Sequence, residues 1–88
     1  MDSVRAAWLR ALIEVSGPER DWVTARQVAA ELTRNRGTGA RVSSHAAGAN
    51  LRRLRTDGYV EARPADGWSW WRPTQAGADE SAAESSSP

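Results

Sequence analysis

The stretch VSSHAAGANLRRLRTDGYVEARPADGWSWWRPT, residues 42–74, contains the signals that decide the fold. Either Ser43 or Ser44 can cap a helix that we expect to run to Asp57. Gly58 then supplies the left-handed residue that commonly ends a helix. At 100° per residue one face of this helix collects the apolar side chains predicted to enter the core, namely Ala47, Leu51 and Leu54.

Two short strands are predicted directly after this helix. Residues 59–63 alternate polar side chains with Val60 and Ala62, as a half-buried strand does. Residues 68–72 place one set of side chains on each face, with Trp68, Trp70 and Arg72 opposite Ser69 and Trp71. Because the turn sequence Pro-Ala-Asp-Gly at 64–67 lies between them, the stretch predicts a helix that runs into a β-hairpin.

The residues before this stretch supply the supporting helices. A helical apolar stripe over residues 4–15 follows a capping Ser3 and stops at Gly17–Pro18. The tetrapeptide Thr24-Ala25-Arg26-Gln27 is a capping box, which predicts a second helix to about residue 33. Trp22–Val23 could add a short strand to the sheet, and 33–41 (TRNRGTGAR) is predicted to be a loop.

The expected fold class is α+β, mainly α, with three helices and a small antiparallel hairpin. We expect residues 1–77 to form one domain and residues 78–88, an acidic and Ser-rich segment, to be a disordered tail. Thr74 could cap one short helical turn before that tail.

Composition narrows the class of protein. A chain of 88 residues allows one small domain, and it has no cysteine, apolar span or secretory signal, so a cytoplasmic, nucleoid-associated location is expected. The net charge is only +1, but residues 22–63 contain eight arginines and three acidic residues. A basic centre with an acidic tail is typical of a nucleic-acid binder.

The segment LRRLRTDGYVEARPADGWSWWRPTQAG resembles the recognition helix and wing of bacterial winged helix-turn-helix regulators of the MarR, ArsR and PadR type. The matching elements are Leu51 and Leu54, Gly58-Tyr59-Val60-Glu61, and Arg72-Pro73-Thr74-Gln75-Ala76-Gly77. The resemblance implies that the chain binds double-stranded DNA as a small transcriptional regulator, a repressor. It departs from these regulators in its longer 33–41 loop and in Pro73, which suggests that the second strand ends early or lies at an edge.

The candidate DNA-binding residues lie on one helix face and around it. Small residues on the exposed face of the 43–57 helix permit approach to base edges in the major groove, and its arginines would meet phosphate, although the face could simply be solvated. Arginines of the 33–41 loop and the arginine beside the turn could reach phosphate or the minor groove. The full set is Thr24, Arg26, Arg34, Arg36, Arg41, Ser43, Ser44, His45, Ala49, Arg52, Arg53 and Arg63.

Other residues have alternative interpretations. Gly48 in mid-helix costs about 1 kcal/mol relative to alanine, which indicates a close contact with DNA or with a neighbouring helix. Core packing is expected for Trp8, Trp22 and Trp71, whereas Trp68 and Trp70 are predicted to be core or protein interface, with nucleic-acid contact as the alternative. Arg55 could pair with Asp57 or Glu61.

No catalytic motif or metal-ligand spacing is present, and His45 is the only histidine, so neither enzyme activity nor a cofactor nor a metal is expected. A homodimer is expected, formed through helix 4–15 or the Trp-rich hairpin. Two other functions fit the same pattern: a winged-helix protein-interaction module that uses the Trp-rich hairpin, and a phage- or plasmid-type architectural DNA-binding protein.

Overall fold

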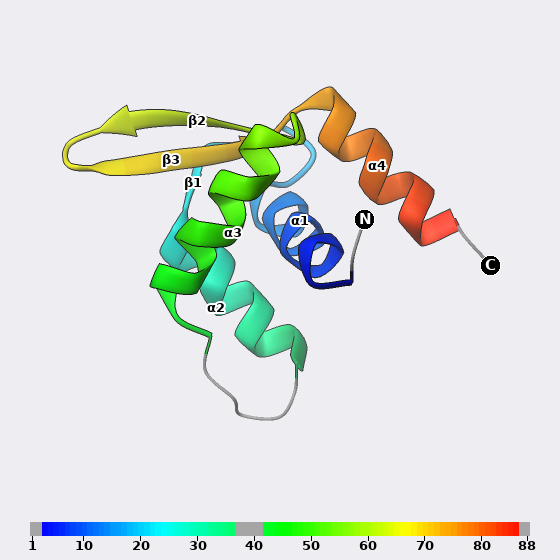
Figure 1. Cartoon of the computed structure of the whole chain (residues 1–88), viewed down its shortest axis with the longest axis horizontal. Helices are drawn as coiled ribbons and strands as arrows, with labels where there is room; N and C mark the ends of the chain where they lie inside the picture. Colours follow the sequence, from blue (N-terminus) through cyan, green and yellow to red (C-terminus); the bar gives the residue numbers. More distant parts are fainter. Residues whose placement is uncertain (1–2, 37–41, 87–88) are drawn as a thin grey trace.

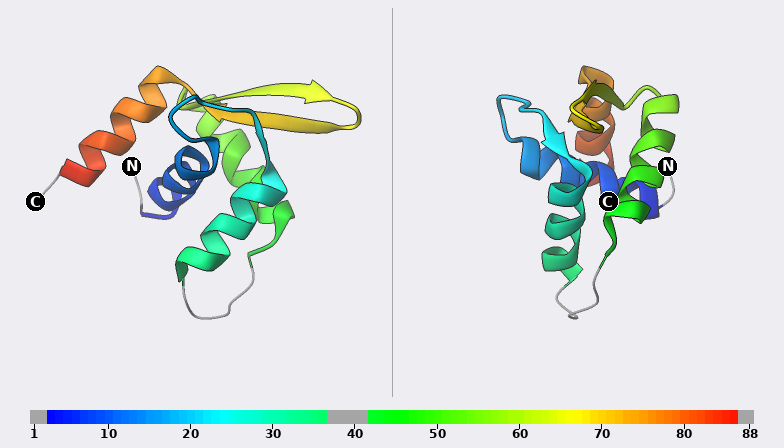
Figure 2. Two further views of the ribbon diagram at one scale, coloured as in Figure 1. Left: turned by 180° about the vertical axis from the view of Figure 1, so that it is seen from behind. Right: turned by 90° about the vertical axis from the view of Figure 1, so that its left-hand side faces the viewer.

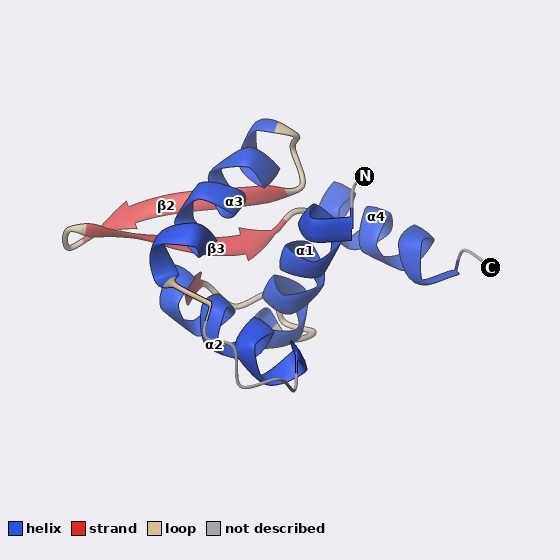
Figure 3. Cartoon of the chain, turned by 60° about the horizontal axis from the view of Figure 1, so that its bottom comes forward, coloured by secondary structure: helices blue, strands red, loops and turns tan. Residues whose placement is uncertain are grey.

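The computed structural model describes residues 3–36 and 42–86. Within them the chain forms four helices and a three-stranded antiparallel sheet with strand order β1-β3-β2 (Figures 1 and 3). The elements in chain order are α1 (Ser3–Ser16), β1 (Val23–Thr24), α2 (Ala25–Arg36), α3 (Ser44–Thr56), β2 (Val60–Ala65), β3 (Trp68–Pro73) and α4 (Gln75–Ser86). The α+β class is confirmed, with one helix more than expected. The third strand, β1, is the short strand that was expected near Trp22–Val23, one residue further along the chain.

One core holds these elements together. Helix α1 lies between α4 and the α2–α3 pair, and the β2–β3 hairpin extends away from it to the left of Figure 1. Figure 2 shows the same arrangement from two other sides, with α2 and α3 next to each other. The buried apolar side chains come from every element except α4: Trp8, Leu9, Ala11, Leu12, Val23, Val28, Ala29, Leu32, Ala47, Leu51, Leu54, Val60 and Trp71.

The ends of α2 and α3 follow the predicted capping signals. The Ser43 Oγ accepts from the Ala46 amide at 3.1 Å, and Asp57 is the C-cap of α3, followed by Gly58 with a φ of +85°. Before α2, the Gln27 amide donates to Thr24 Oγ1 at 3.2 Å, while the Thr24 amide donates to Gln27 Oε1 at 2.8 Å. The predicted capping box is therefore confirmed, as is the buried face of Ala47, Leu51 and Leu54.

Helix α2 is longer than predicted. Residues 33–36, expected in the loop, are its last turn. The Thr33 hydroxyl donates to the Ala29 carbonyl at 2.9 Å and accepts from the Val42 amide at 3.0 Å, and Asn35 donates to Glu14 of α1 at 3.3 Å. Because these partners lie on other turns and another helix, periodicity along residues 33–36 could not reveal the extension. The rest of the predicted loop, 37–41, lies outside the described residues.

The hairpin turn is tighter than the predicted four-residue turn 64–67. Ala65 pairs with Trp68, so only Asp66 and Gly67 connect the strands. Both have positive φ, +51° and +87°, which is the type I′ geometry that matches the twist of paired strands. Pro64 is consequently a strand residue, and it is tolerated because β2 is an edge strand. The expectation that the second strand ends early is wrong, because Pro73 is the buried last residue of β3. Pro73 pairs only with Val60 of β2, since β1 pairs no further than Trp71, so β3 has a partner on one side at this position.

Helix α4 occupies residues where a disordered tail was expected. It begins after Thr74, whose Oγ1 accepts from the Gly77 amide at 3.1 Å and donates to the Gly58 carbonyl at 2.8 Å. The Thr74 amide also donates to the Tyr59 carbonyl at 3.0 Å. The expectation of disorder from residue 78 is therefore wrong for residues 78–86, where α4 continues and packs against α1. No helix in the described ranges is long and apolar enough to cross a membrane.

Gly77 makes a very close backbone contact where α4 begins. A Cβ placed there would lie 1.9 Å from the Tyr59 carbonyl oxygen, which is a backbone atom that cannot rotate away. Gly48 of α3 is the opposite case, because a Cβ there would meet only the Arg52 guanidinium, at 3.5 Å.

We expect Gly77→Ala and Gly48→Ala to change stability with opposite signs. Alanine raises helix propensity by about 1 kcal/mol at either site, but at Gly77 the steric overlap outweighs it, with a net loss of about 2 kcal/mol. Gly48→Ala serves as the matched control and should be neutral or stabilising. Urea unfolding followed by circular dichroism measures both, and equal midpoints for the two variants would contradict the close approach at Gly77.

Candidate nucleic-acid interface

An open groove of about 690 Å³ lies between the start of α2, the exposed face of α3 and β3. It brings together five of the residues singled out in the sequence: Thr24, Arg26, Ser44, His45 and Arg52. The other lining residues are Ala25, Gly48, Trp68, Ser69 and Trp71. Its ionisable lining residues are Arg26, His45 and Arg52, so among the described residues no carboxylate lines it.

Two helices begin at this groove. Ala25 and Arg26 are the first residues of α2, and Ser44 and His45 are the first residues of α3. Amide groups in the first turn of a helix have no acceptor within the helix, and the helix dipole adds partial positive charge there. In Figure 1 both helices begin on the side toward which the hairpin extends. The groove is therefore electropositive from its backbone as well as from its arginines, which suits a phosphate-bearing ligand.

The face of α3 opposite the core is exposed as predicted. His45, Ala49, Arg52, Arg53 and Thr56 are all exposed, whereas Ala47, Leu51 and Leu54 are fully buried. No neighbouring helix approaches Gly48, so the alternative that this glycine serves a helix–helix contact is wrong. Gly48 lowers the helix propensity of α3 without serving a packing contact inside the protein. Because it has no side chain, a ligand can approach the solvent-facing surface of α3 closely at this position.

The comparisons with known proteins agree with this geometry. No protein-family model and no curated protein matches the sequence. The structure is similar to that of Bacillus subtilis PadR in complex with operator DNA, with a TM-score of 0.74 and 13% sequence identity. The similarity covers 99% of this chain and 49% of the PadR chain, so this chain spans about half the length of the protein it matches.

This chain has the winged helix-turn-helix fold. In the terms of that fold, α2 and α3 occupy the positions of the helix-turn-helix, α3 that of the recognition helix and the β2–β3 hairpin that of the wing. The groove thus lies between the recognition helix and the base of the wing.

Some predicted site residues lie outside the groove. Ser43, Ala49 and Arg53 are exposed on or beside α3 without lining it, and the Ser43 hydroxyl is engaged as the cap. Arg41 lies outside the described residues, and Arg36 is the last residue of α2.

Arg63 lies on the outer face of the wing. Its guanidinium carbon is 5.1 Å from the centroid of the Trp22 ring, and that of Arg72 is 4.5 Å from the same ring. Arg72 also forms an ion pair with Glu61. The Trp22 ring is half-buried and lies beside two arginine cations. The prediction that Trp22 is a core residue is therefore wrong.

The expected partners of Arg55 are engaged elsewhere. Asp57 accepts from Arg5 of α1 at 3.0 Å, and Glu61 pairs with Arg72 across the wing. Arg55 itself is exposed. The structure therefore does not show the predicted pairing of Arg55 with either carboxylate. The turn after α3 and the strand register bring other arginines to Asp57 and Glu61.

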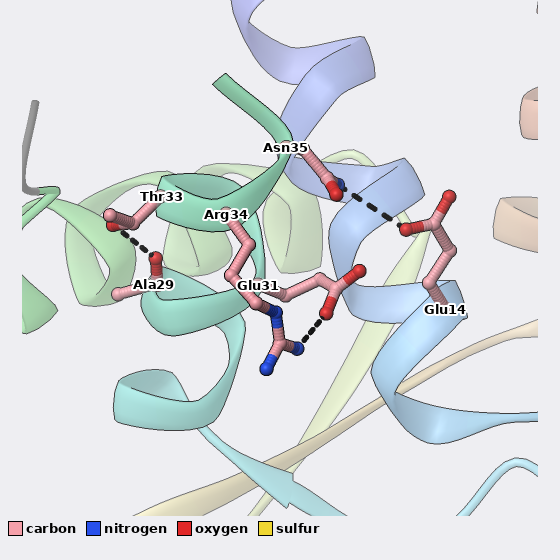
Figure 4. A network of polar contacts seen from close by, with 6 residues as sticks. All are labelled: Glu14, Ala29, Glu31, Thr33, Arg34 and Asn35. Atoms are coloured by element: carbon pink, nitrogen blue, oxygen red, sulfur yellow. Dashed lines mark hydrogen bonds and ion pairs between the residues drawn. The ribbon is translucent and has the colours of Figure 1, made fainter. Parts of the chain in front are cut away.

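Arg34 is held by a polar network on α2 (Figure 4). Its guanidinium pairs with Glu31 one turn earlier, and Asn35 beside it bonds Glu14 of α1. Chiefly because of the Arg34 guanidinium, the pKa of the Glu31 carboxyl lies below its ordinary value. The Arg34 side chain is still 72% exposed, so its other N–H donors are available to a phosphate.

Ser69 and Trp71 line the groove but were not singled out as site residues. The signal was present in the alternation of 68–72, which puts Ser69 and Trp71 on the face opposite Trp70. What the sequence could not indicate is that this face turns toward the recognition helix. Within the described part of the chain, no group of three or more His, Cys, Asp or Glu residues is placed to hold a metal ion.

We expect Arg34→Gln to raise the pKa of Glu31 toward its ordinary value. The folded-state pKa lies below that of the unfolded chain, so the stabilisation from this pair is present above the unfolded pKa of about 4.3. It is lost as the pH falls through the folded pKa. Carboxyl titration by NMR measures the shift, with Arg26→Gln on the same helix as control. An unchanged Glu31 titration in Arg34→Gln would contradict the assignment.

Proposed function

We propose that this protein binds double-stranded DNA sequence-specifically and acts as a small transcriptional repressor. The observation that carries the proposal is the groove itself, where two helix N-termini, Arg26 and Arg52 meet beside an exposed helix face without a carboxylate. A duplex offers a line of phosphates beside a major groove about 12 Å wide, which admits one α-helix. Helix α3 enters that groove in the proposed complex, and the wing lies against the flanking backbone or minor groove.

The α3 residues divide between base contact and backbone contact. Ser44, His45 and Ala49 are early in the helix, and with Gly48 they let the helix approach base edges closely. Arg52 and Arg53 follow one turn later and are long enough to reach phosphates at the groove edge. At the start of α2, Thr24 and Arg26 contact the phosphate backbone through the helix end and the guanidinium.

The remaining arginines contribute at the periphery. In the sequence Arg34, Arg36 and Arg41 come at the end of α2 or shortly before α3, and we assign them to flanking phosphates. Arg63 on the outer face of the wing reaches the backbone or minor groove after leaving Trp22. The similarity to PadR, whose structure was determined with operator DNA, supports DNA as the ligand class. A protein bound in this way represses by occupying DNA that the transcription machinery needs.

The proposed active form is a homodimer on a two-fold operator. An open groove of about 360 Å³ lies along α1 beside the end of α2, with Val4, Ala7, Trp8 and Leu32 among its lining residues. The Val4 side chain is 58% exposed although it belongs to the apolar stripe of α1. A second copy packing on α1 would cover this surface and place two recognition helices on one face of the duplex.

Arg52→Ala tests the DNA proposal. Wild-type affinity for a duplex should fall steeply with salt, because binding releases counterions from phosphates. The variant should bind all sequences more weakly, with the slope of log affinity against log salt reduced by about one. Fluorescence anisotropy across a salt series measures this, and the same titration at stoichiometric concentrations should give two chains per operator.

The matched control is Arg20→Ala, an exposed arginine after α1 that lines neither the α3 groove nor the proposed dimer surface, which should leave the slope unchanged. If the wild-type chain binds neither random duplexes nor duplexes enriched by selection, the DNA proposal is wrong. A slope that changes equally in both variants would indicate diffuse charge attraction instead of a docked recognition helix.

Gly48→Ala should separate folding from binding. Its added methyl group meets only the Arg52 side chain in the free protein, so stability should be kept or increased by up to about 1 kcal/mol. In the complex the same methyl group lies between α3 and the base edges, so affinity for the best operator should fall about tenfold. Unfolding midpoints and anisotropy titrations of one preparation give both quantities. A variant that is more stable and binds equally well would remove Gly48 from the interface.

A further inference from the structure

The tip of the wing has no basic residue. It consists of Pro64, Ala65, Asp66, Gly67 and Trp68, and Asp66 and Gly67 are both exposed. A wing that touches DNA through its tip therefore cannot do so by a guanidinium–phosphate bond from these positions. Asp66 would be repelled by phosphate, so any attraction at the tip must come from a non-ionic contact.

Trp68 is the large side chain available for such a contact. It is 61% exposed, although Trp8 and Trp71 elsewhere in the chain are each only 4% exposed. It also lines the groove that contains Arg26, His45 and Arg52. Trp68 thus borders the groove that contains these basic residues.

The wing fixes the backbone position of Trp68 before any ligand arrives. Trp68 pairs with Ala65 directly beside the two-residue Asp66–Gly67 turn, whose two positive φ angles define a tight hairpin. The small Ala65 side chain opposite leaves the indole uncovered. An aromatic side chain on a fixed backbone binds with little loss of side-chain entropy, since only two torsions have to be ordered.

We infer that Trp68 packs against deoxyribose and base edges in the minor groove next to the major groove that α3 enters. This inference rests on the proposed function, because it assigns the wing contact within the same complex. Apolar and aromatic side chains enter minor grooves most easily at flexible pyrimidine–purine steps such as TA. Trp68 therefore makes the wing contact through shape and apolar packing, while Arg26 and Arg52 supply the ionic contacts.

A protein partner is the competing occupant for an exposed tryptophan. The neighbours of Trp68 favour DNA, because they are two arginines, a histidine and two helix N-termini, and no lining carboxylate is described. A site built for a protein surface would gain little from so much unopposed positive charge beside the aromatic ring. Duplex DNA can pair with the positive charge and contact the aromatic ring at the same time.

The test compares Trp68→Ala, Trp68→Phe and Arg52→Ala with the wild type on one duplex obtained by selection, over a salt series. Trp68→Ala should lose about tenfold in affinity, as removal of one aromatic contact to a nucleotide does, with an unchanged salt slope. Trp68→Phe should retain most of the affinity, and Arg52→Ala should lower the slope by about one. Because Trp68 is exposed, its variants should unfold at the wild-type urea midpoint.

Fluorescence gives a second readout that a purely structural role would not move. Contact with deoxyribose and base edges should shield Trp68 from acrylamide, so that the protection seen on adding DNA to the wild type is reduced in Trp68→Ala. Sedimentation of the wild type and Trp68→Ala without DNA should be identical.

Each outcome separates the inference from the proposed function. Failure of the wild type to bind any duplex overturns both. Wild-type binding with an equal affinity of Trp68→Ala overturns the inference and leaves the proposed function standing. If Trp68→Ala sediments differently from the wild type without DNA, Trp68 lies in a protein–protein contact. If Trp68→Ala has a reduced salt slope, Trp68 acts only by positioning the arginines. Either result overturns the inference.

Discussion

The burial of one face of α3 is the constraint on which the rest of the structure depends. Ala47, Leu51 and Leu54 are all fully excluded from solvent by packing against α1, α2 and the sheet. In a domain with a single small core, the free energy from these contacts cannot be replaced elsewhere. Because the helix cannot rotate without exposing two leucines, its opposite face is held outward in one orientation.

The position of the wing relative to α3 is set by a second, polar constraint. Gly58 and Tyr59 follow α3 directly, and their carbonyl groups accept from the hydroxyl and the amide of Thr74, which follows β3. Gly77 then lies against the Tyr59 carbonyl, so α4 starts only where a residue without a side chain allows it. The end of the recognition helix, both wing strands and α4 thus meet at one junction. The base of the wing and the end of α3 are consequently held together by these hydrogen bonds as well as by the chain itself.

The arginines are divided between structure and surface. Arg5, Arg34 and Arg72 form ion pairs with Asp57, Glu31 and Glu61, which tie α1 to α3, close a turn of α2 and connect the wing strands. Arg26, Arg52 and Arg53 are instead exposed near the starts of α2 and α3 or along the outer face of α3. This division is what converts a chain of net charge +1 into a molecule with one electropositive groove.

The sequence by itself determined the features that depend on near neighbours in the chain. The caps at Thr24 and Ser43, the end of α3 at Asp57 and the buried face of Leu51 and Leu54 all follow from spacings of three or four residues. The resemblance of residues 51–77 to a recognition helix and wing was sufficient to predict the fold, because those sequence motifs depend on the same local backbone geometry.

Tertiary structure decided the features whose partners are distant in sequence. Helix α2 extends to Arg36 through contacts with Val42 and Glu14, and α4 forms where Thr74 and Gly77 meet the Gly58–Tyr59 backbone. The placement of Arg63 over Trp22 and the assembly of the groove from α2, α3 and β3 likewise require the folded chain. Local preferences of φ, ψ and side-chain period act over a few residues, whereas these contacts join residues brought together only when the single core has formed.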